Sequence, residues 1–406
     1  MRVIHYAVAV LALLMASPLS AAGQDRKPIR IAVLNDQSGI YAEVGGLGSV
    51  VAARLAAEEF GGEIDGRKIE VVGIDHQNKP DIAAAAARKG ITVDGFNVIA
   101  DGASSAAALA INEVTKANDT IFIVAGGAST EFTGKSCGPE TFQFTYDTYA
   151  LANGTANAIV KQGGDTWFFI TADYVFGHAL QKEATKFIEK AGGKVVGSVK
   201  HPTGTQDFSS FLLQAQASQA KIIGLANAGA DTINAVKQGG EFGVVDGGQN
   251  FAGLLIFLSD VHAMGLEKAK GLLLTTSFYW DLTDETRKFA SRFGAQMNGR
   301  MPTMIHAGVY SGVKHYLKAV KETGAVDPRV VARKMRQTPV NDAYNNNVEI
   351  RPDGRVMHEM YLMQVKSPAE SKGPYDYYKV VQKIPGKDAF KPLSESECPL
   401  VKNAQN

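Results

Sequence analysis

Residues 29–60 read IRIAVLNDQSGIYAEVGGLGSVVAARLAAEEF, and this stretch contains three successive signals. Residues 29–34 form a short apolar run, which is typical of a buried strand. Residues 35–43 are mostly polar and predict a loop, and residues 44–60 place small and apolar side chains on one face of a helix. A buried strand followed by a helix is the repeating unit of a parallel sheet, so this stretch predicts an α/β fold.

The same alternation of strand and helix continues along the chain and then starts again. The first series predicts further helices and strands at 68–74, 82–93, 97–100, 104–117 and 120–124. The second series begins with a helix at 148–162 and predicts strands at 166–171, 194–199, 221–225, 251–258 and 271–275. Because the pattern runs twice with a join near residue 145, it predicts two doubly wound, Rossmann-like α/β lobes.

The C-terminal third predicts segments that return to each lobe. Helices are expected at 284–297, 303–323 and 327–337, and strand-like segments at 357–365 and 375–381. We expect an N-terminal lobe of residues 23–145 completed by about 283–350, a C-terminal lobe of residues 146–282 completed by about 351–385, and a tail at 386–406. Such a division needs several chain crossings, so we expect a multi-strand hinge.

The first 22 residues are typical of a secretory signal peptide. Arg2 gives a basic start, residues 7–16 are apolar, and Ser-Ala-Ala at 20–22 supplies the small residues of a cleavage site. The apolar run is too short for a membrane anchor and has no charged residue after it. We therefore expect cleavage after Ala22 and a free, soluble mature protein outside the cytoplasm.

The charge balance bears on nucleic-acid binding, and the two cysteines bear on a disulfide. Lys and Arg total 42 against 41 Asp and Glu, so no basic excess predicts a nucleic-acid partner. The two cysteines, Cys137 and Cys398, form an even count in an oxidising compartment, which favours one disulfide between the tail and the first lobe. The alternative is two unpaired buried thiols.

The motifs of common cofactor sites and hydrolases are missing from the sequence. Gly45-Gly46-Leu47-Gly48 lacks the spacing of a dinucleotide-binding turn, and no phosphate-binding loop is present. The run at 102–106 resembles a nucleophile elbow only superficially, and its serines are better explained as helix caps. The eight histidines lack metal-ligand spacing. We therefore predict no enzyme activity, no cofactor and no metal.

Three loops of the first lobe place hydroxyls and bare amides where strands end and helices begin. Such a wall suits an anion, and without a lysine or a phosphate cradle it suits a carboxylate. Ordinary capping and turn chemistry is the alternative for each loop by itself. The candidate residues are Ser38, Tyr41, Ser104, Ser105, Gly127, Ala128 and Ser129.

The corresponding loops of the second lobe offer aromatic rings and an amide, which would cover an apolar or flat ligand body. The alternative for each ring is a place in the hydrophobic core. Asp173 and Asp260 either meet a ligand amine or cap helices. The candidate residues are Tyr174, Phe176, Asn227, Asp260 and Phe278.

In order and spacing, these features resemble the type I periplasmic solute-binding proteins of ABC importers, in the branch for leucine, isoleucine and valine. The resemblance covers essentially the whole mature chain. In the first lobe it is carried by IRIAVL at 29–34, Ser38-Gly39, Ser104-Ser105, and GAS at 127–129 with EFT at 131–133. In the second lobe it is carried by DYVFG at 173–177 and by the segment 308–318, which contains Tyr310.

The resemblance implies two lobes that close on one ligand. It implies that Ser105, Ala128 and Ser129 hold a ligand carboxylate and that Phe176, where amino-acid binders have Tyr, contributes to the opposite wall. Relatives also take aromatic acids, amides and other small carboxylates.

We therefore expect the substrate-binding component of an ABC importer, located in the periplasm. Its ligand would be a hydrophobic or branched-chain amino acid, or an aromatic acid such as a hydroxybenzoate, phenylpropenoate or arylpyruvate. The expected partners are this ligand and a membrane permease, and the protein is expected to be a monomer. The alternatives are a ligand-binding sensor and an amide or urea binder without a transport role.

Overall fold

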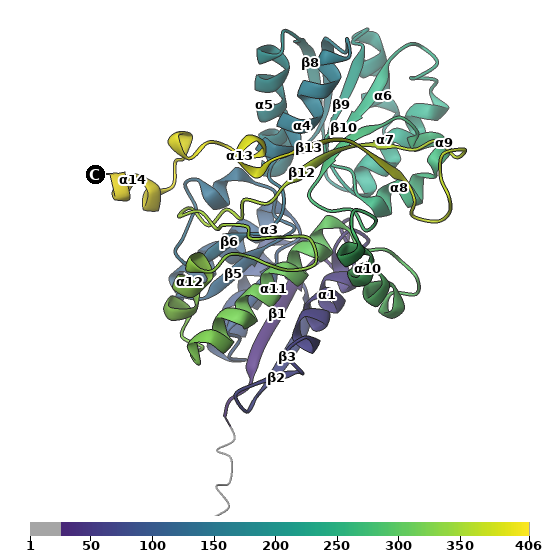
Figure 1. The fold of residues 1–406 in the computed structure, drawn as a ribbon. Coiled ribbons are helices and arrows are strands. Elements are labelled where there is room, and N and C mark those ends of the chain that lie inside the picture. Colours follow the sequence, from purple (N-terminus) through teal and green to yellow (C-terminus); the bar gives the residue numbers. More distant parts are fainter. Residues whose placement is uncertain (1–25, 406) are drawn as a thin grey trace, which may run out of the picture.

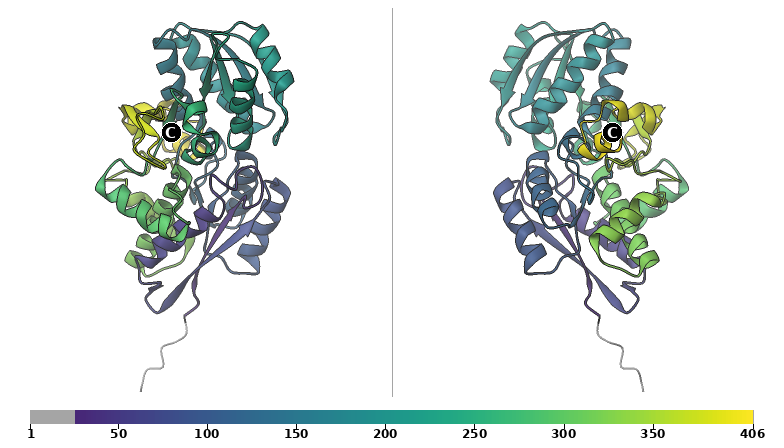
Figure 2. Two further views of the ribbon diagram at one scale, coloured as in Figure 1. Left: turned by 90° about the vertical axis from the view of Figure 1, so that its right-hand side faces the viewer. Right: turned by 90° about the vertical axis from the view of Figure 1, so that its left-hand side faces the viewer.

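The computed structural model describes residues 26–405, so the predicted signal at 1–22 lies outside the described residues. Two α/β lobes lie one above the other, and the green and yellow C-terminal third of the chain runs along both (Figure 1). The turned views show the yellow C-terminal segment beside the level at which the lobes meet (Figure 2).

The first lobe is built on a six-stranded sheet with the order β2-β3-β1-β4-β5-β6. The parallel strands are β1 (Ile29–Asn35), β3 (Arg67–Asp75), β4 (Val98–Asp101), β5 (Ile121–Val124) and β6 (Thr141–Gln143). The sequence prediction missed β6 and the edge strand β2 (Glu63–Ile64), which pairs antiparallel with β3. Between β2 and β3, Asp65 and Gly66 have φ of 51° and 74°, a turn that these residue types tolerate.

Helices cover both faces of this sheet. On one face α2 packs against α3, and Leu34, Ile99 and Phe122 are fully buried there. On the other face α1 packs against α10 and α11, and α12 packs against α11, so the chain returns to the first lobe after building the second. The bounds are α1 (Gly46–Glu58), α2 (Pro80–Thr92), α3 (Ser105–Ala117), α10 (Asp284–Gln296), α11 (Met304–Thr323) and α12 (Pro328–Gln337).

The second lobe has a parallel sheet with the order β10-β9-β7-β8. Its strands are β7 (Thr166–Ala172), β8 (Lys194–His201), β9 (Ile222–Ala226) and β10 (Asn250–Gly253). Its helices are α4 (Thr148–Lys161), α5 (Val175–Lys190), α6 (Ser209–Ala217), α7 (Ala230–Glu241), α8 (Leu258–Met264) and α9 (Leu266–Ala269). Two helix-covered parallel sheets confirm the predicted α/β class.

Two strand predictions in this lobe were wrong. Residues 271–275 were expected to continue the parallel series, but β11 (Leu273–Thr276) joins β12 (Met360–Val365) and β13 (Tyr378–Ile384) in a separate antiparallel sheet. The strand predicted at 251–258 is shorter in the structure, because β10 ends at Gly253 and Leu258 already begins α8. The carboxylate of Asp260 accepts a hydrogen bond from Phe257 N at 2.9 Å, which caps this helix.

Within the described residues, three segments lead the chain from one lobe to the other. They are residues 144–147 before α4, 277–283 before α10, and 356–359 before β12. The first and third lie side by side: Gln143 and Arg355, the residues just before them, form a parallel bridge, and His358 Nε2 lies 2.9 Å from Thr145 O. These segments form the multi-strand hinge.

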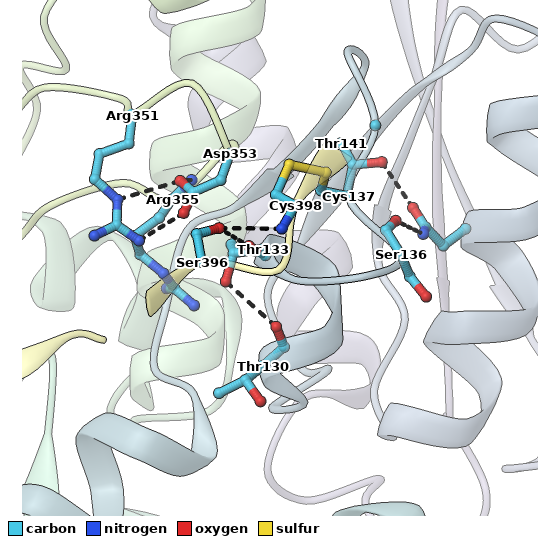
Figure 3. The surroundings of a disulfide bond; sticks show 12 residues. Thr130, Thr133, Ser136, Cys137, Thr141, Arg351, Asp353, Arg355, Ser396 and Cys398 are labelled. Atoms are coloured by element: carbon cyan, nitrogen blue, oxygen red, sulfur yellow. Dashed lines mark hydrogen bonds and ion pairs between the residues drawn. A yellow bond between two sulfur atoms is a disulfide. The ribbon is translucent and has the colours of Figure 1, made fainter. Parts of the chain in front are cut away.

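The tail returns to the first lobe, where a disulfide holds it (Figure 3). After β13, α13 (Gly386–Ala389) packs on α4, and Cys398 then bonds to Cys137 with Cα atoms 5.7 Å apart. Ser396 Oγ also donates to Thr133 O at 3.4 Å. The predicted disulfide is confirmed, and it makes the tail a further connection between the lobes. Two short helices flank the bond, η2 (Leu393–Glu395) and α14 (Pro399–Gln405).

Replacing both cysteines in the variant C137S/C398S should destabilise the protein. The bond joins residues 261 positions apart, and its loss should lower the free energy of unfolding by about 2–5 kcal/mol. Urea unfolding measures this change, with the native protein in reductant as the control that should reach the same midpoint. A midpoint unchanged by both treatments would contradict the prediction.

Candidate ligand-binding site

A narrow cavity lies between the lobes, at the carboxyl ends of the strands of both parallel sheets. Its volume is about 20 Å³, and roughly 10–15 Å³ is the least that admits one water. A solute larger than water therefore has to separate the two walls before it binds. The lining residues are Tyr41, Val44, Ala103, Ser104, Ser105, Gly126, Ala128, Tyr146, Tyr174, Phe176, Ala228, Leu255, Phe257 and Ile305.

The first-lobe wall is centred on the N-terminus of α3. Ser104 is the N-cap, and its Oγ accepts a hydrogen bond from Ala107 N at 3.4 Å. Ser105 Oγ accepts from both Ala128 N and Ser129 N at 3.1 Å. Since these bonds use the oxygen only as an acceptor, the Ser105 proton remains available to a ligand, close to the positive end of the helix dipole.

A buried carboxylate supports this wall from behind. Asp101 ends β4 with φ of 85°, and its side chain accepts from Ala103 N at 3.2 Å and from Asn35 Nδ2 at 2.8 Å. These bonds fix the turn that leads into α3. Burial raises the pKa of Asp101, and the hydrogen bonds from Asn35 and from Ala103 N oppose that rise.

The second-lobe wall is apolar and aromatic. Tyr174 and Phe176 follow β7 at the start of α5, with ring centroids 5.8 Å apart. Phe257, from the loop after β10, meets Tyr146 edge to face at 6.0 Å. Such surfaces suit a hydrocarbon or ring rather than a second charged group.

The two lobes are in direct contact across the cavity. The hydroxyls of Tyr41 and Tyr174 lie 2.6 Å apart, and burial raises the pKa of both groups, so both stay protonated at neutral pH. Asp36 positions the Tyr41 loop, because its carboxylate accepts from Gly39 N at 2.8 Å and from Tyr41 N at 3.1 Å. The structure is therefore a closed form.

Half of the candidate residues line this cavity, namely Tyr41, Ser104, Ser105, Ala128, Tyr174 and Phe176. The others lie outside the lining. Ser38 is exposed and bonds Asp75 at 2.6 Å, and Ser129 caps the short helix η1 (Thr130–Thr133). Gly127 lies beside the lining residues Gly126 and Ala128, and its carbonyl accepts a hydrogen bond at 2.9 Å from Gln143.

The remaining candidates are buried away from the cavity. Asn227 is buried, with its amide bonded to His201 and to Thr232 Oγ1 at 2.7 Å. Phe278 packs edge to face on Phe289 and Tyr344. Neither side chain faces the cavity.

Both candidate acids are engaged away from the cavity. Asp260 is buried and caps α8, and Asp173 pairs with His178 and Lys200 at the surface. Among the described residues that line the cavity, none is an acid.

Sequence reasoning missed Tyr146, Leu255, Phe257, Ile305 and Val44. The sequence did contain a signal for Tyr146, because this residue stands at the predicted join between the lobes. It comes one residue before Asp147, the N-cap of α4. The sequence contained no signal for the apolar residues, since an apolar side chain looks the same whether it faces a core or a ligand.

Over residues 26–405, no helix is long and apolar enough to cross a membrane. The same part of the chain has no cluster of three or more His, Cys, Asp or Glu side chains that could hold a metal ion.

The comparison with known proteins agrees with this architecture. Residues 28–374 match the model of the periplasmic binding protein family. The chain belongs to this family. The resemblance predicted from the sequence is thereby confirmed, and membership of a family of solute-binding proteins agrees with the prediction of a binding protein rather than an enzyme.

Solved structures of this family are similar over nearly the whole chain. A periplasmic binding protein from Burkholderia mallei is 47% identical, with 92% of this chain and 99% of that one covered and a TM-score of 0.89. A branched-chain amino acid ABC transporter periplasmic ligand-binding protein from Burkholderia xenovorans LB400 is 39% identical, with 92% and 100% covered and a TM-score of 0.82. An ABC transporter solute-binding protein from Rhodopseudomonas palustris HaA2, in complex with p-hydroxybenzoic acid, is 21% identical and shares the fold, with 90% and 99% covered and a TM-score of 0.81.

The buried acid Asp260 gives this periplasmic binding protein a testable pH dependence. Burial raises the pKa of Asp260 to about 7, against about 3.9 in an unfolded chain. The folded state binds this proton more tightly, so a rise in pH from about 4 to about 7 costs stability. In D260N that contribution is absent, and stability should fall less over this range.

Urea unfolding of native protein and D260N at pH 5 and pH 7.5 measures the difference. The amide of D260N can still accept the hydrogen bond from Phe257 N, so the helix cap is retained. Equal losses of stability in the two proteins would mean that Asp260 is ionised throughout.

Proposed function

We propose that the chain is the periplasmic substrate-binding component of an ABC importer and that it binds a small carboxylate between its lobes. The hydrogen bonding of Ser105 carries this proposal. Its oxygen is occupied by Ala128 N and Ser129 N, which leaves its proton to point at an anion. The N-terminus of α3 adds favourable electrostatics at the same place.

The ligand that the cavity favours is an acid without a charged amine. An ammonium group buried in this lining would have no carboxylate to pair with, and an unpaired buried charge is costly. The ring or hydrocarbon body of the ligand would lie against Tyr174 and Phe176. We therefore favour an aromatic acid, and the related fold that holds p-hydroxybenzoic acid supports this preference.

A branched-chain amino acid is the second candidate. The 39% identical relative from Burkholderia xenovorans, which is named for branched-chain amino acids, favours it. In that case backbone carbonyls rather than an acidic side chain would have to accept from the ligand amine.

Binding would use the motion between the lobes. The ligand would settle on the first lobe, and the second lobe would close over it, since only contacts to both lobes favour the closed form. The hydroxyl contact between Tyr41 and Tyr174 would part to admit the ligand. A membrane permease would then recognise the closed shape.

A thermal-shift screen of ligand-stripped protein tests the proposal. The panel contains aliphatic and aromatic amino acids, hydroxybenzoates, phenylpropenoates, arylpyruvates and small amides. A ligand at 100 times its Kd should add roughly 2.7 kcal/mol to stability. Hits among aromatic acids support the favoured ligand, hits among amino acids support the second candidate, and hits only among amides contradict a carboxylate ligand.

Removing the Ser105 hydroxyl should weaken binding of whichever acid the screen identifies. In S105A the ligand loses a donor, and two backbone amides lose their acceptor, so affinity should fall roughly tenfold or more. Isothermal titration measures the loss. The matched control is S38A, because Ser38 is exposed and lies outside the cavity; similar affinities for S105A and S38A would refute the role of Ser105.

A further inference from the structure

Arg355 is a fully buried arginine at the point where the third crossing leaves the first lobe. Its guanidinium donates to Asp147 Oδ2 at 2.9 Å, to Thr145 O at 2.5 Å, and to Gln143 Oε1. The ring of Phe390, from the C-terminal tail, lies 4.4 Å from the guanidinium carbon. Figure 3 shows this arginine close to the segment held by the disulfide. Burial lowers the pKa of Arg355 to about 10, so the side chain is charged at neutral pH.

The contacts of Arg355 join the two lobes at the hinge. Its backbone belongs to the first lobe, because it bridges to Gln143 at the end of β6. Its ion-pair partner Asp147 is the N-cap of α4, where the other carboxylate oxygen accepts from Ala150 N at 2.8 Å. The first helix of the second lobe is therefore tied to the edge of the first-lobe sheet.

Gln143 extends the same network to the cavity wall. Its Nε2 donates to Gly127 O at 2.9 Å, Ser129 O at 3.3 Å and Tyr146 O at 3.4 Å. The first two carbonyls belong to the neighbours of Ala128, and the third belongs to Tyr146. Both Ala128 and Tyr146 line the cavity.

The guanidinium decides which way the Gln143 amide faces. An amide has an oxygen that only accepts and a nitrogen that only donates. With Arg355 beside it, the oxygen must face the guanidinium and the nitrogen must face the carbonyls of the wall. The reversed orientation would place donor against donor and acceptor against acceptor.

We propose that Arg355 is a positioning residue that, through Gln143, holds the part of the cavity wall to which Ala128 and Tyr146 belong, while it ties the first crossing to the third. The proposal rests on the proposed function in one respect, since this wall is the one assigned to the ligand carboxylate. The network itself lies entirely within the protein, so ligand-free protein tests it and a failed ligand screen leaves the test intact.

The test compares R355K with R351K by hydrogen–deuterium exchange of the ligand-free, full-length protein. A lysine cannot reach Gln143, Thr145 and Asp147 together, because its ammonium is compact and lacks the guanidinium fork. Exchange in peptides covering 125–131 and 144–149 should rise roughly tenfold in R355K, because the wall loses a charge-assisted contact. In β7, remote from the network, exchange should stay at the native rate.

Arg351 provides the matched control. Its side chain pairs with Asp353 and donates to Lys391 O in the tail, and its hydrogen bonds do not include Gln143. R351K should leave the wall peptides at the native rate. A rise in R355K that is equal across the whole chain, or equal to that of R351K, would overturn the proposal, because a purely structural arginine behaves in that way.

A second variant keeps the arginine and removes only the donors. Q143E retains an acceptor for Arg355 but has no Nε2 to donate to the three carbonyls. It should raise exchange in peptide 125–131, which Arg355 reaches only through Gln143, and R355K added to Q143E should raise exchange in that peptide no further. Native exchange at the wall in Q143E would overturn the proposal even if R355K failed to fold.

Discussion

Two parallel sheets turn the carboxyl ends of their strands toward one gap, and the rest of the structure depends on that constraint. All strands of a parallel sheet run the same way, so their following loops collect along one edge. The loops after β1, β4 and β5 face those after β7, β9 and β10. Hydroxyls and aromatic rings far apart in the sequence therefore meet without any element built specially to bring them together.

Buried acidic side chains near the gap hold loops in place, and this limits the charge that a ligand can carry. Asp36 caps the Tyr41 loop, Asp101 caps the turn before α3, and Asp260 caps α8. Each carboxylate is used by backbone amides, so none remains to meet a positive group in the cavity. The first lobe instead offers the Ser105 hydroxyl as a hydrogen-bond donor, because its oxygen is used only as an acceptor. Under the proposed function, the first-lobe wall would hold an anion and the second-lobe wall would cover a hydrocarbon or ring.

The hinge contains more connections than the three crossing segments. Arg355 ties the first crossing to the third, and the tail passes Phe390 over that arginine before Cys398 bonds to the first lobe. The tail thus leaves the second lobe after β13, packs on α4 and ends on the first lobe. Relative motion of the lobes has to be accommodated by all of these connections together.

The sequence by itself determined the alternation of strands and helices, the doubling of that pattern, the pairing of Cys137 with Cys398 and the small hydroxyl loops of the first lobe. These features follow from local periodicity and from residue counts, which need no knowledge of distant contacts. The sequence did not predict the antiparallel sheet of β11 to β13, because strand propensity does not specify a strand's partner. Nor did it tell Ser105, which lines the cavity, from Ser129, or Phe176 from Phe278. The tertiary structure decided which side chains face the gap, because hydrogen bonds and packing between remote segments, such as Gln143 to Gly127 and Phe278 to Tyr344, fix the direction of each side chain.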